Sequence, residues 1–301
     1  MRAPAALQNA ANIETDSAMA HHDKFLLAGV MGWPVMHSRS PLIHNHWFKT
    51  HGLAGRYVPL AIKPEGLQAA LRALPALGFA GCNVTIPHKQ EAMRIVDELH
   101  QSARVMGAVS CVTVREDGSL LGSNNDAFGF MRNLQHRQPQ WRADAGPAAV
   151  IGAGGGARAV CYGLLQAGVR EVRIVNRHLE RAQEVASALA GLGGNISAHA
   201  WEQRHALLAG AALVVNTTSQ GMVGQGVLDI DLALLAAGAI AADIVYIPLE
   251  TPFLAAARAR GNPTVDGLGM LLQQGPLAWK AWFGIEPEVT DELRALVERS
   301  L

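Results

Sequence analysis

Cysteine is scarce in this chain of 301 residues. The three cysteines, Cys82, Cys111 and Cys161, are an odd number and show no CxxC spacing. This argues against a disulfide framework and a structural zinc site, so we expect a reducing compartment, the cytoplasm, and no bound metal. An excess of charge of either sign is also missing, because Lys plus Arg and Asp plus Glu number 25 each. Without a basic stripe interleaved with aromatic residues, the sequence predicts no nucleic-acid partner.

Long hydrophobic runs are missing as well. The longest weakly polar stretch, residues 232–242, falls far short of the ~20 residues of a membrane-spanning helix, so we expect no membrane partner. Residues 1–24 contain no apolar core of a signal peptide and are not rich in arginine, and we interpret them as a disordered tail. The remaining chain is long enough for one large or two ordinary domains. Its expected partner is a small molecule, and a monomer and a homodimer are both compatible with the sequence.

Short apolar runs alternate with amphipathic stretches from Phe25 onward, as expected of βα units. We predict strands over 25–32, 57–62, 78–86, 171–177, 212–219 and 240–246, a strand, glycine turn and helix over 148–168, and helices over 42–50, 64–77, 89–99, 179–190, 266–284 and 290–300. The predicted fold class is α/β with two domains, the first over 25–125 and the second, a Rossmann-like doubly wound parallel sheet, over 126–261, with C-terminal helices over 262–301 that return to the first domain.

A glycine motif, G-x-G-x-x-A, follows the apolar strand that begins at residue 148. It is formed by Gly152, Gly154 and Ala157. The first glycine makes the turn, the second lets backbone N–H groups approach a pyrophosphate, and the small third residue permits close packing of the helix. Gly155 belongs to the same turn, and Arg158 beside it could contact a phosphate or cap its helix. The motif in this setting predicts dinucleotide binding by residues 126–261; a merely flexible glycine loop is the alternative.

The end of the next predicted strand indicates which dinucleotide is bound. A cofactor with a free ribose 2′-hydroxyl calls for Asp or Glu there, whereas this chain has Asn176 and Arg177. A guanidinium can bind a 2′-phosphate through paired charge-assisted hydrogen bonds, and Arg181, one turn into the next helix, offers a second cation. The sequence therefore favours NADP over NAD, with two solvated arginines as the alternative interpretation.

Lysine is rare beside arginine, with five residues against twenty. Arginine stays protonated at any useful pH, but a partly desolvated lysine can give and take a proton near neutrality. Lys89 ends the string NVTIPHK, which leaves a strand and places Asn83, Thr85 and Lys89 around a strand-end loop, where α/β folds bind ligands. Lys89 is therefore a candidate acid/base residue, although a surface lysine is the default interpretation.

Two further motifs add polar groups to this candidate site. The string GSNNDAFGF places Asp126 at the predicted junction of the two domains, where a carboxylate near the ammonium of Lys89 would hold and orient it. The string HSRSP follows the first strand and adds the hydroxyls of Ser38 and Ser40, which suit a carboxylate or a polyol. These groups predict a small polar substrate.

The ordered motifs of the chain resemble those of the shikimate dehydrogenase family over roughly residues 25–284. The motifs are GWPVMHSRSPLIHN, NVTIPHK, GAVSCV, GSNNDAFGF, GAGGGARA, NTTSQGM, DIVYIPLETPFL and DGLGMLLQQ. The resemblance implies reversible hydride transfer between NADPH and 3-dehydroshikimate, which gives shikimate, and a part in aromatic amino acid biosynthesis. It implies a catalytic pair at Lys89 and Asp126, substrate contacts at Ser38, Ser40, Asn83, Thr85, Ser110, Tyr246 and Gln274, and a nicotinamide lining at Thr217, Thr218, Gly267 and Met270.

Several positions depart from the family pattern. The usual GAVNT reads GAVSC, so that Ser110 replaces a substrate-contacting Asn and Cys111 replaces Thr, and GxNTD reads GSNND with Asn125 in place of Thr. The shorter serine would leave room, or a water, beside the substrate ring. Quinate, an amino analogue or another cyclic polyol acid is therefore an alternative substrate, and a ligand-sensing protein without catalysis is an alternative class.

Other side chains are assigned to packing or to the surface. His37, His44 and His46 lack the spacing and the carboxylate of a metal site, and we expect them in a loop and on a helix surface. Cys111 is expected to be a packed strand residue. A predicted helix carries Trp279, Trp282 and Phe283 on one apolar face, and we expect this face to pack against the core of the first domain.

Overall fold

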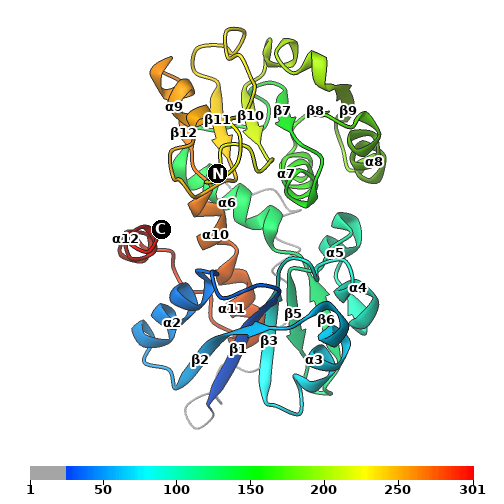
Figure 1. Cartoon of the computed structure of the whole chain (residues 1–301), viewed down its shortest axis with the longest axis vertical. Helices are drawn as coiled ribbons and strands as arrows, with labels where there is room; N and C mark the ends of the chain where they lie inside the picture. Colours follow the sequence, from blue (N-terminus) through cyan, green and yellow to red (C-terminus); the bar gives the residue numbers. More distant parts are fainter. Residues whose placement is uncertain (1–24) are drawn as a thin grey trace. The chain divides into compact units, whose positions relative to one another are not determined.

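The structure, a computed structural model, describes residues 25–301, so the tail predicted over 1–24 lies outside the described residues. The described chain divides into two compact units. One comprises residues 25–125 together with Leu272–Leu301, and the other comprises Asp126–Leu271. Both units contain a six-stranded sheet flanked by helices, which confirms the predicted α/β class with two domains (Figure 1). No helix within residues 25–301 combines the length and the apolar character needed to cross a membrane.

The unit Asp126–Leu271 is built on a fully parallel sheet with the strand order β12-β11-β10-β7-β8-β9. From the central strand β7 the chain adds β8 and β9 on one side, then returns to add β10, β11 and β12 on the other (Figure 1). This is the predicted doubly wound order, whose direction reverses between β7 and β10, and ligands bind at the carboxyl ends of the strands at such a point. Its elements are α6 (Asp126–Arg137), β7 (Ala148–Ile151), α7 (Gly155–Gln166), β8 (Glu171–Asn176), α8 (Leu179–Leu189), β9 (Asn195–Ala200), the 3-10 turns η2 (Trp201–Gln203) and η3 (Ala206–Leu208), β10 (Leu213–Asn216), β11 (Ile240–Asp243), α9 (Pro252–Ala259), β12 (Thr264–Val265) and the first part of α10 (Leu268–Gln273).

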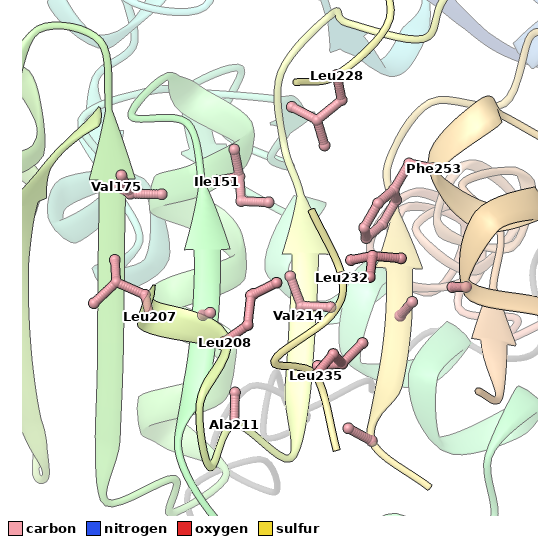
Figure 2. Close-up of a cluster of buried hydrophobic side chains, with 14 of the residues drawn as sticks. Ile151, Val175, Leu207, Leu208, Ala211, Val214, Leu228, Leu232, Leu235 and Phe253 are labelled. Carbon is pink, nitrogen blue, oxygen red and sulfur yellow. The ribbon is translucent and has the colours of Figure 1, made fainter. Parts of the chain in front are cut away.

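The central strands β7, β10 and β11 are buried along their whole length, and their residues are apolar except for Asn216 and Asp243, which end β10 and β11. On one face, Ile151 of β7, Val175 of β8 and Val214 of β10 point toward leucines of η3 and of the segment before β11, and toward Phe253 of α9 (Figure 2). This packed core holds the carboxyl ends of β7, β8, β10 and β11 in fixed positions.

The unit that contains residues 25–125 has a mixed sheet of order β2-β1-β3-β5-β6-β4. Strand β1 runs parallel to β2 and β3, whereas β5 runs antiparallel to β3 and β6. The register places Asn83 opposite Cys111, and Cys111 opposite Ser123, so the ends of β1, β3 and β6 and the start of β5 share one sheet edge. The elements are β1 (Leu26–Gly32), α2 (Ser40–Thr50), β2 (Gly55–Ala61), η1 (Pro64–Gly66), α3 (Leu67–Ala73), β3 (Phe79–Val84), α4 (Ala92–Ile95), β4 (Glu98–Leu99), α5 (Gln101–Met106), β5 (Cys111–Val114), β6 (Leu120–Ser123), the end of α10, α11 (Gly275–Phe283) and α12 (Asp291–Glu298).

Helix α11, near the C-terminus, packs against this mixed sheet. Its Trp282 Nε1 donates a hydrogen bond of 2.9 Å to the Val112 carbonyl oxygen. Gly81 of β3 makes room for the indole, because a Cβ at this position would lie 2.3 Å from Trp282 Nε1. Trp279 and Phe283 of the same helix are fully buried. The prediction that this aromatic face packs against the first part of the chain is therefore confirmed.

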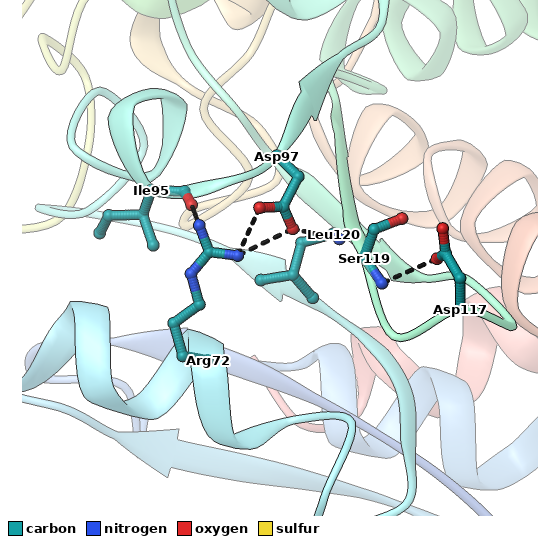
Figure 3. Close-up of polar contacts among 6 residues, drawn as sticks. All are labelled: Arg72, Ile95, Asp97, Asp117, Ser119 and Leu120. Carbon is teal, nitrogen blue, oxygen red and sulfur yellow. Dashed lines mark hydrogen bonds and ion pairs between the residues drawn. The ribbon is translucent and has the colours of Figure 1, made fainter.

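The prediction of a single helix over 89–99 is wrong. Only Ala92–Ile95 is helical, and the chain then extends into β4. The backbone N–H of Asp97 donates to Leu120 O at 3.0 Å, and the Asp97 carboxylate accepts the Leu120 N–H at 2.8 Å. Arg72 of α3 pairs with the same carboxylate at 2.6 and 2.8 Å and donates to Ile95 O at 2.5 Å (Figure 3). Pairing with the distant edge of β6 thus overrides the local helical pattern.

Candidate active site

The residues predicted to contact the substrate in the unit 25–125 come from loops and strand ends along the shared sheet edge. This is the edge at which the parallel strands β1 and β3 end, the usual place for a ligand in α/β folds. The residues are Ser38 in the loop after β1, Ser40 at the start of α2, Asn83 and Thr85 at the end of β3, Lys89 in the following loop, and Ser110 just before β5.

The loop that carries Lys89 is held by its neighbours. His88 is buried, and its Nε2 lies 2.7 Å from the Ile62 carbonyl oxygen, so Nε2–H is the donor. The His88 backbone N–H donates to Thr85 O at 2.9 Å, and Val109 N–H donates to Lys89 O at 2.8 Å. Because backbone and side-chain bonds fix both sides of the loop, the root of the half-buried Lys89 side chain has a defined position.

Asn83 has both ends of its amide engaged. Its Nδ2 donates to Ser110 O at 3.2 Å, and its Oδ1 accepts the hydroxyl of Tyr57 at 2.7 Å. Sequence reasoning did not single out Tyr57. The sequence offers one signal, the rarity of tyrosine, since the chain contains only three. No local pattern links Tyr57 to Asn83, which lies 26 positions away.

Ser110 is buried, and its hydroxyl is used inside the protein. Ser110 Oγ accepts the Asn125 backbone N–H at 2.9 Å and donates to Asn124 Oδ1 at 3.3 Å. This pair of bonds ties the start of β5 to the segment after β6. Asp126, the next residue, is 8% exposed at the start of α6. The predicted substrate contact of Ser110 and the catalytic role of Asp126 stay predictions.

The glycine motif in the unit Asp126–Leu271 is suited to a pyrophosphate. Gly152 has φ +111°, and a Cβ there would lie 2.6 Å from Thr217 Oγ1, so the fold itself requires glycine. Gly154 and Gly155 differ, because a Cβ at either position would meet no atom within 4 Å. That open space lies at the start of the twelve-residue helix α7, where the first-turn N–H groups lack intrahelical acceptors. A dinucleotide phosphate fits this arrangement.

The end of β8 carries the residues expected to select NADP. Asn176 Nδ2 donates to His178 O at 2.9 Å, which shapes the turn into α8. Arg177 in this turn and Arg181 in the first part of α8 are exposed, whereas Arg158 on α7 is half-buried. Positive charge at an accessible strand end is what a 2′-phosphate requires.

A buried polar network, which sequence reasoning missed, joins the ends of β10 and β11. The Asp243 carboxylate is 2% exposed and accepts hydrogen bonds from Asn216 Nδ2 at 3.0 and 3.1 Å, from Thr251 Oγ1 at 2.8 Å and from Val245 N–H at 2.9 Å. Asn216 Oδ1 in turn accepts the Thr218 hydroxyl at 2.8 Å. The network joins the loop after β10, which contains Thr217 and Thr218, to the loop after β11, which contains Tyr246.

The remaining predicted residues of the nicotinamide and substrate sites lie after β10, after β11 and in the helices beyond β12. Thr217 Oγ1 donates to Ile151 O at 2.7 Å, so this hydroxyl is bonded to the last residue of β7. Gly267 is required by packing, because a Cβ there would lie 2.3 Å from Ile244 O. Tyr246 after β11, Met270 in α10 and Gln274 between α10 and α11 are half-buried. Their assigned contacts stay predictions.

Burial raises the pKa of Asp243 to about 6, although the hydrogen bonds from Val245, Thr251 and Asn216 oppose the rise. A carboxyl group with a raised pKa in the folded state stabilises the fold at low pH, and this contribution is lost as the pH rises from the unfolded value near 3.8 through about 6. We expect the unfolding free energy of the wild type, relative to Asp243→Asn, to fall by up to about 3 kcal/mol over this range. Urea unfolding of both proteins between about pH 3.5 and about pH 7, a range that spans both pKa values, measures this difference. Parallel pH profiles would contradict the expectation.

The prediction for His44 requires a correction. His44 is not on the helix surface but 3% exposed, stacked on Tyr57 with ring centroids 4.0 Å apart. Its Nδ1 accepts the Trp279 Nε1–H at 2.7 Å, and burial lowers its pKa to about 3. The ring is therefore neutral and part of the packed interior, because its position on α2 faces α11. Within residues 25–301 no group of three or more His, Cys, Asp and Glu side chains is placed to hold a metal ion.

Comparison with known proteins connects this geometry to a family. Residues 30–112 match the shikimate dehydrogenase substrate binding domain, and residues 136–224 match the shikimate / quinate 5-dehydrogenase domain. A shikimate dehydrogenase (NADP(+)) of Rhodospirillum rubrum is 56% identical over 91% of this chain and 97% of its own length. The chain belongs to the shikimate dehydrogenase family. The resemblance inferred from the ordered motifs is thereby confirmed.

Solved structures of the shikimate dehydrogenase family and its neighbours share the fold. A shikimate 5-dehydrogenase from Thermus thermophilus in complex with NADP(H) and shikimate is 34% identical, with a TM-score of 0.80 over 92% of this chain and 100% of that chain. A quinate dehydrogenase from Corynebacterium glutamicum in complex with NAD is 30% identical, with a TM-score of 0.85 over 92% and 100%. The same fold thus carries more than one cyclic polyol acid and more than one nicotinamide cofactor.

Proposed function

We propose that this shikimate dehydrogenase family member catalyses the reversible NADP-dependent reduction of 3-dehydroshikimate to shikimate. The observation that carries the proposal is the fixed loop that presents Lys89 at the sheet edge which also bears Asn83. The relatives named as shikimate dehydrogenase (NADP(+)), at 44% to 56% identity, support the substrate and the cofactor.

Lys89 is the proposed acid/base group. When bound, NADPH supplies the hydride that reduces the substrate carbonyl carbon. Negative charge then develops on the carbonyl oxygen, and the protonated Lys89 ammonium would stabilise this charge and deliver the proton. In the reverse direction the neutral amine would accept the proton of the alcohol. Asp126 is the proposed second member of the pair, which orients the ammonium and accepts a hydrogen bond from a neighbouring substrate hydroxyl.

The remaining polar groups of the sheet edge would bind and orient the substrate. Ser38 and Ser40 are proposed to bind the carboxylate, because their hydroxyls sit in the loop after β1 and at the start of α2. Asn83 and Thr85 are proposed to contact ring hydroxyls. Further contacts are proposed for Ser110, Tyr246 and Gln274.

The cofactor would be held by backbone and by cations of the unit Asp126–Leu271. The open space at Gly154 and Gly155 and the start of α7 would receive the pyrophosphate. Arg177 and Arg181 would bind the 2′-phosphate. Asn176, which shapes the turn of Arg177, is a further proposed cofactor contact. The other proposed cofactor contacts are Gly152, Ala157, Arg158, Thr217, Thr218, Gly267 and Met270.

The setting of the enzyme follows from the same proposal. Three free, buried thiols suit a reducing compartment, so we place the enzyme in the cytoplasm. Its product would enter aromatic amino acid biosynthesis. It would act as a monomer or homodimer.

A purified-enzyme assay that follows NADPH absorbance tests the proposal. Shikimate, quinate and their dehydro forms are each offered with NADP(H) and NAD(H), and we expect shikimate with NADP to give the highest kcat/KM. A higher kcat/KM for quinate than for shikimate would make quinate the substrate in place of shikimate. If the protein binds these acids but turns over none of them with either cofactor, the protein is a ligand sensor and not an enzyme.

A further inference from the structure

Tyr57 of β2 is buried beside two residues of the proposed substrate site. Its side chain is 1% exposed, and its hydroxyl donates to Asn83 Oδ1 at 2.7 Å. Burial raises the pKa of Tyr57, and the nearby Ser40 side chain opposes this rise. The Tyr57 hydroxyl therefore stands between α2 and β3, the elements that carry Ser40 and Asn83.

The position of Tyr57 is fixed at its backbone and at its ring. Asn45 of α2 clamps its backbone, with Asn45 Nδ2 donating to Tyr57 O at 2.9 Å and Tyr57 N–H donating to Asn45 Oδ1 at 3.0 Å. His44 stacks on the phenol ring at an interplanar angle of 4°. Trp279 holds His44 in turn through the 2.7 Å bond to Nδ1. Because His44 stays neutral above its pKa of about 3, this support does not change at ordinary working pH.

These bonds also settle the orientation of the Asn83 amide. The Ser110 carbonyl can only accept, so it must face the nitrogen end, and the Tyr57 hydroxyl then donates to the oxygen end. A flipped amide would place oxygen against the Ser110 carbonyl and lose that bond. Loss of the Tyr57 hydroxyl would leave one of the two bonds that hold the amide, and the remaining bond, at 3.2 Å, is the longer.

We propose that Tyr57 is a positioning residue, which acts through Asn83 to hold its amide in the orientation that contacts a ring hydroxyl of the substrate. This inference rests on the proposed function. The Tyr57 hydroxyl is buried and already bonded, so it is not itself a catalytic residue. Its contribution is to substrate affinity, because a pre-oriented amide loses less freedom when the substrate binds.

Tyr57→Phe tests the inference, because the variant removes only the hydroxyl and keeps the ring against His44. We expect KM for shikimate to rise about tenfold, in the range for loss of a buried hydrogen bond, with kcat within about threefold and KM for NADP unchanged. Tyr162→Phe is the matched control, since it removes a hydroxyl from a half-buried tyrosine of α7 in the other unit, and should leave KM for shikimate unchanged.

A double-mutant cycle separates positioning through Asn83 from general loss of packing. In an Asn83→Ala background Tyr57→Phe should change shikimate affinity, measured by calorimetry, by less than about twofold. In a Ser40→Ala background its effect of about tenfold should persist. An unchanged KM in Tyr57→Phe, a full effect in the Asn83→Ala background, or an equal rise in KM for NADP would overturn the inference while the wild-type activity stands. A wild type that neither binds nor turns over shikimate would overturn the proposed function and this inference with it.

Discussion

Replacement of Lys89 by methionine is expected to lower kcat for shikimate oxidation by about a thousandfold, within the range attributed to general acid/base catalysis. Methionine keeps the unbranched shape of the side chain and lacks only its terminal amine, so it can neither stabilise charge on the carbonyl oxygen nor transfer a proton. Because Lys89 lies outside the glycine motif and the turn with Arg177, NADPH binding should be unchanged. Turnover followed by NADPH absorbance, with NADPH binding followed by fluorescence, measures both quantities.

Two variants sharpen the interpretation of this loss. Lys89→Arg keeps the positive charge but stays protonated, so a loss of similar size would indicate proton transfer, and a much smaller loss would indicate electrostatic stabilisation alone. Lys49→Met, at an exposed position of α2, is the matched control and should keep full activity. A Lys89→Met protein that retains more than about a tenth of wild-type kcat would remove Lys89 from the proposed mechanism.

Sequence reasoning predicted those parts of the fold in which the local residue pattern follows directly from burial or from backbone conformation. The strands β7, β10 and β11 are apolar up to the polar residues Asn216 and Asp243 that end two of them, because both faces are buried. The turn at Gly152 requires a glycine because its φ is positive and Thr217 lies close. By contrast, no strand was predicted over residues 195–200, because β9 lies at the edge of its sheet and is half-exposed, with small and polar residues.

The parts that sequence reasoning missed depend on residues far apart in the chain. His44 was placed on a helix surface, but Trp279, separated from it by 235 positions, covers its ring. Tyr57 and Asn83 are 26 positions apart, and Asn216 and Asp243 are 27 apart. Both members of a pair can belong to quoted motifs, as Asn216 and Asp243 do, but no motif indicates which residues meet in the fold. Sequence reasoning therefore proposes which polar groups contact the ligands, whereas the structure was needed to find the residues that hold these groups.

Arg177→Asp is expected to lower kcat/KM for NADP by about a hundredfold, while kcat/KM for NAD changes by less than about threefold. The guanidinium can form charge-assisted hydrogen bonds with the 2′-phosphate, and a carboxylate at the same place would repel it. The exposed position of Arg177 at the end of β8 means that no buried partner is lost by the substitution. Steady-state kinetics with both cofactors at saturating shikimate measures the change in preference.

Arg170→Asp is the matched control for this substitution. Arg170 is exposed just before β8, at the opposite end of the strand from Arg177, so the variant carries the same change in net charge without a change near the proposed 2′-phosphate. If long-range electrostatics alone governed NADP affinity, the two variants would lose similar affinity, and the loss would shrink in both at high salt. A hundredfold loss confined to Arg177→Asp would instead indicate direct contact. An unchanged preference for NADP in Arg177→Asp would assign the 2′-phosphate to other cations, of which Arg181 is the first to replace.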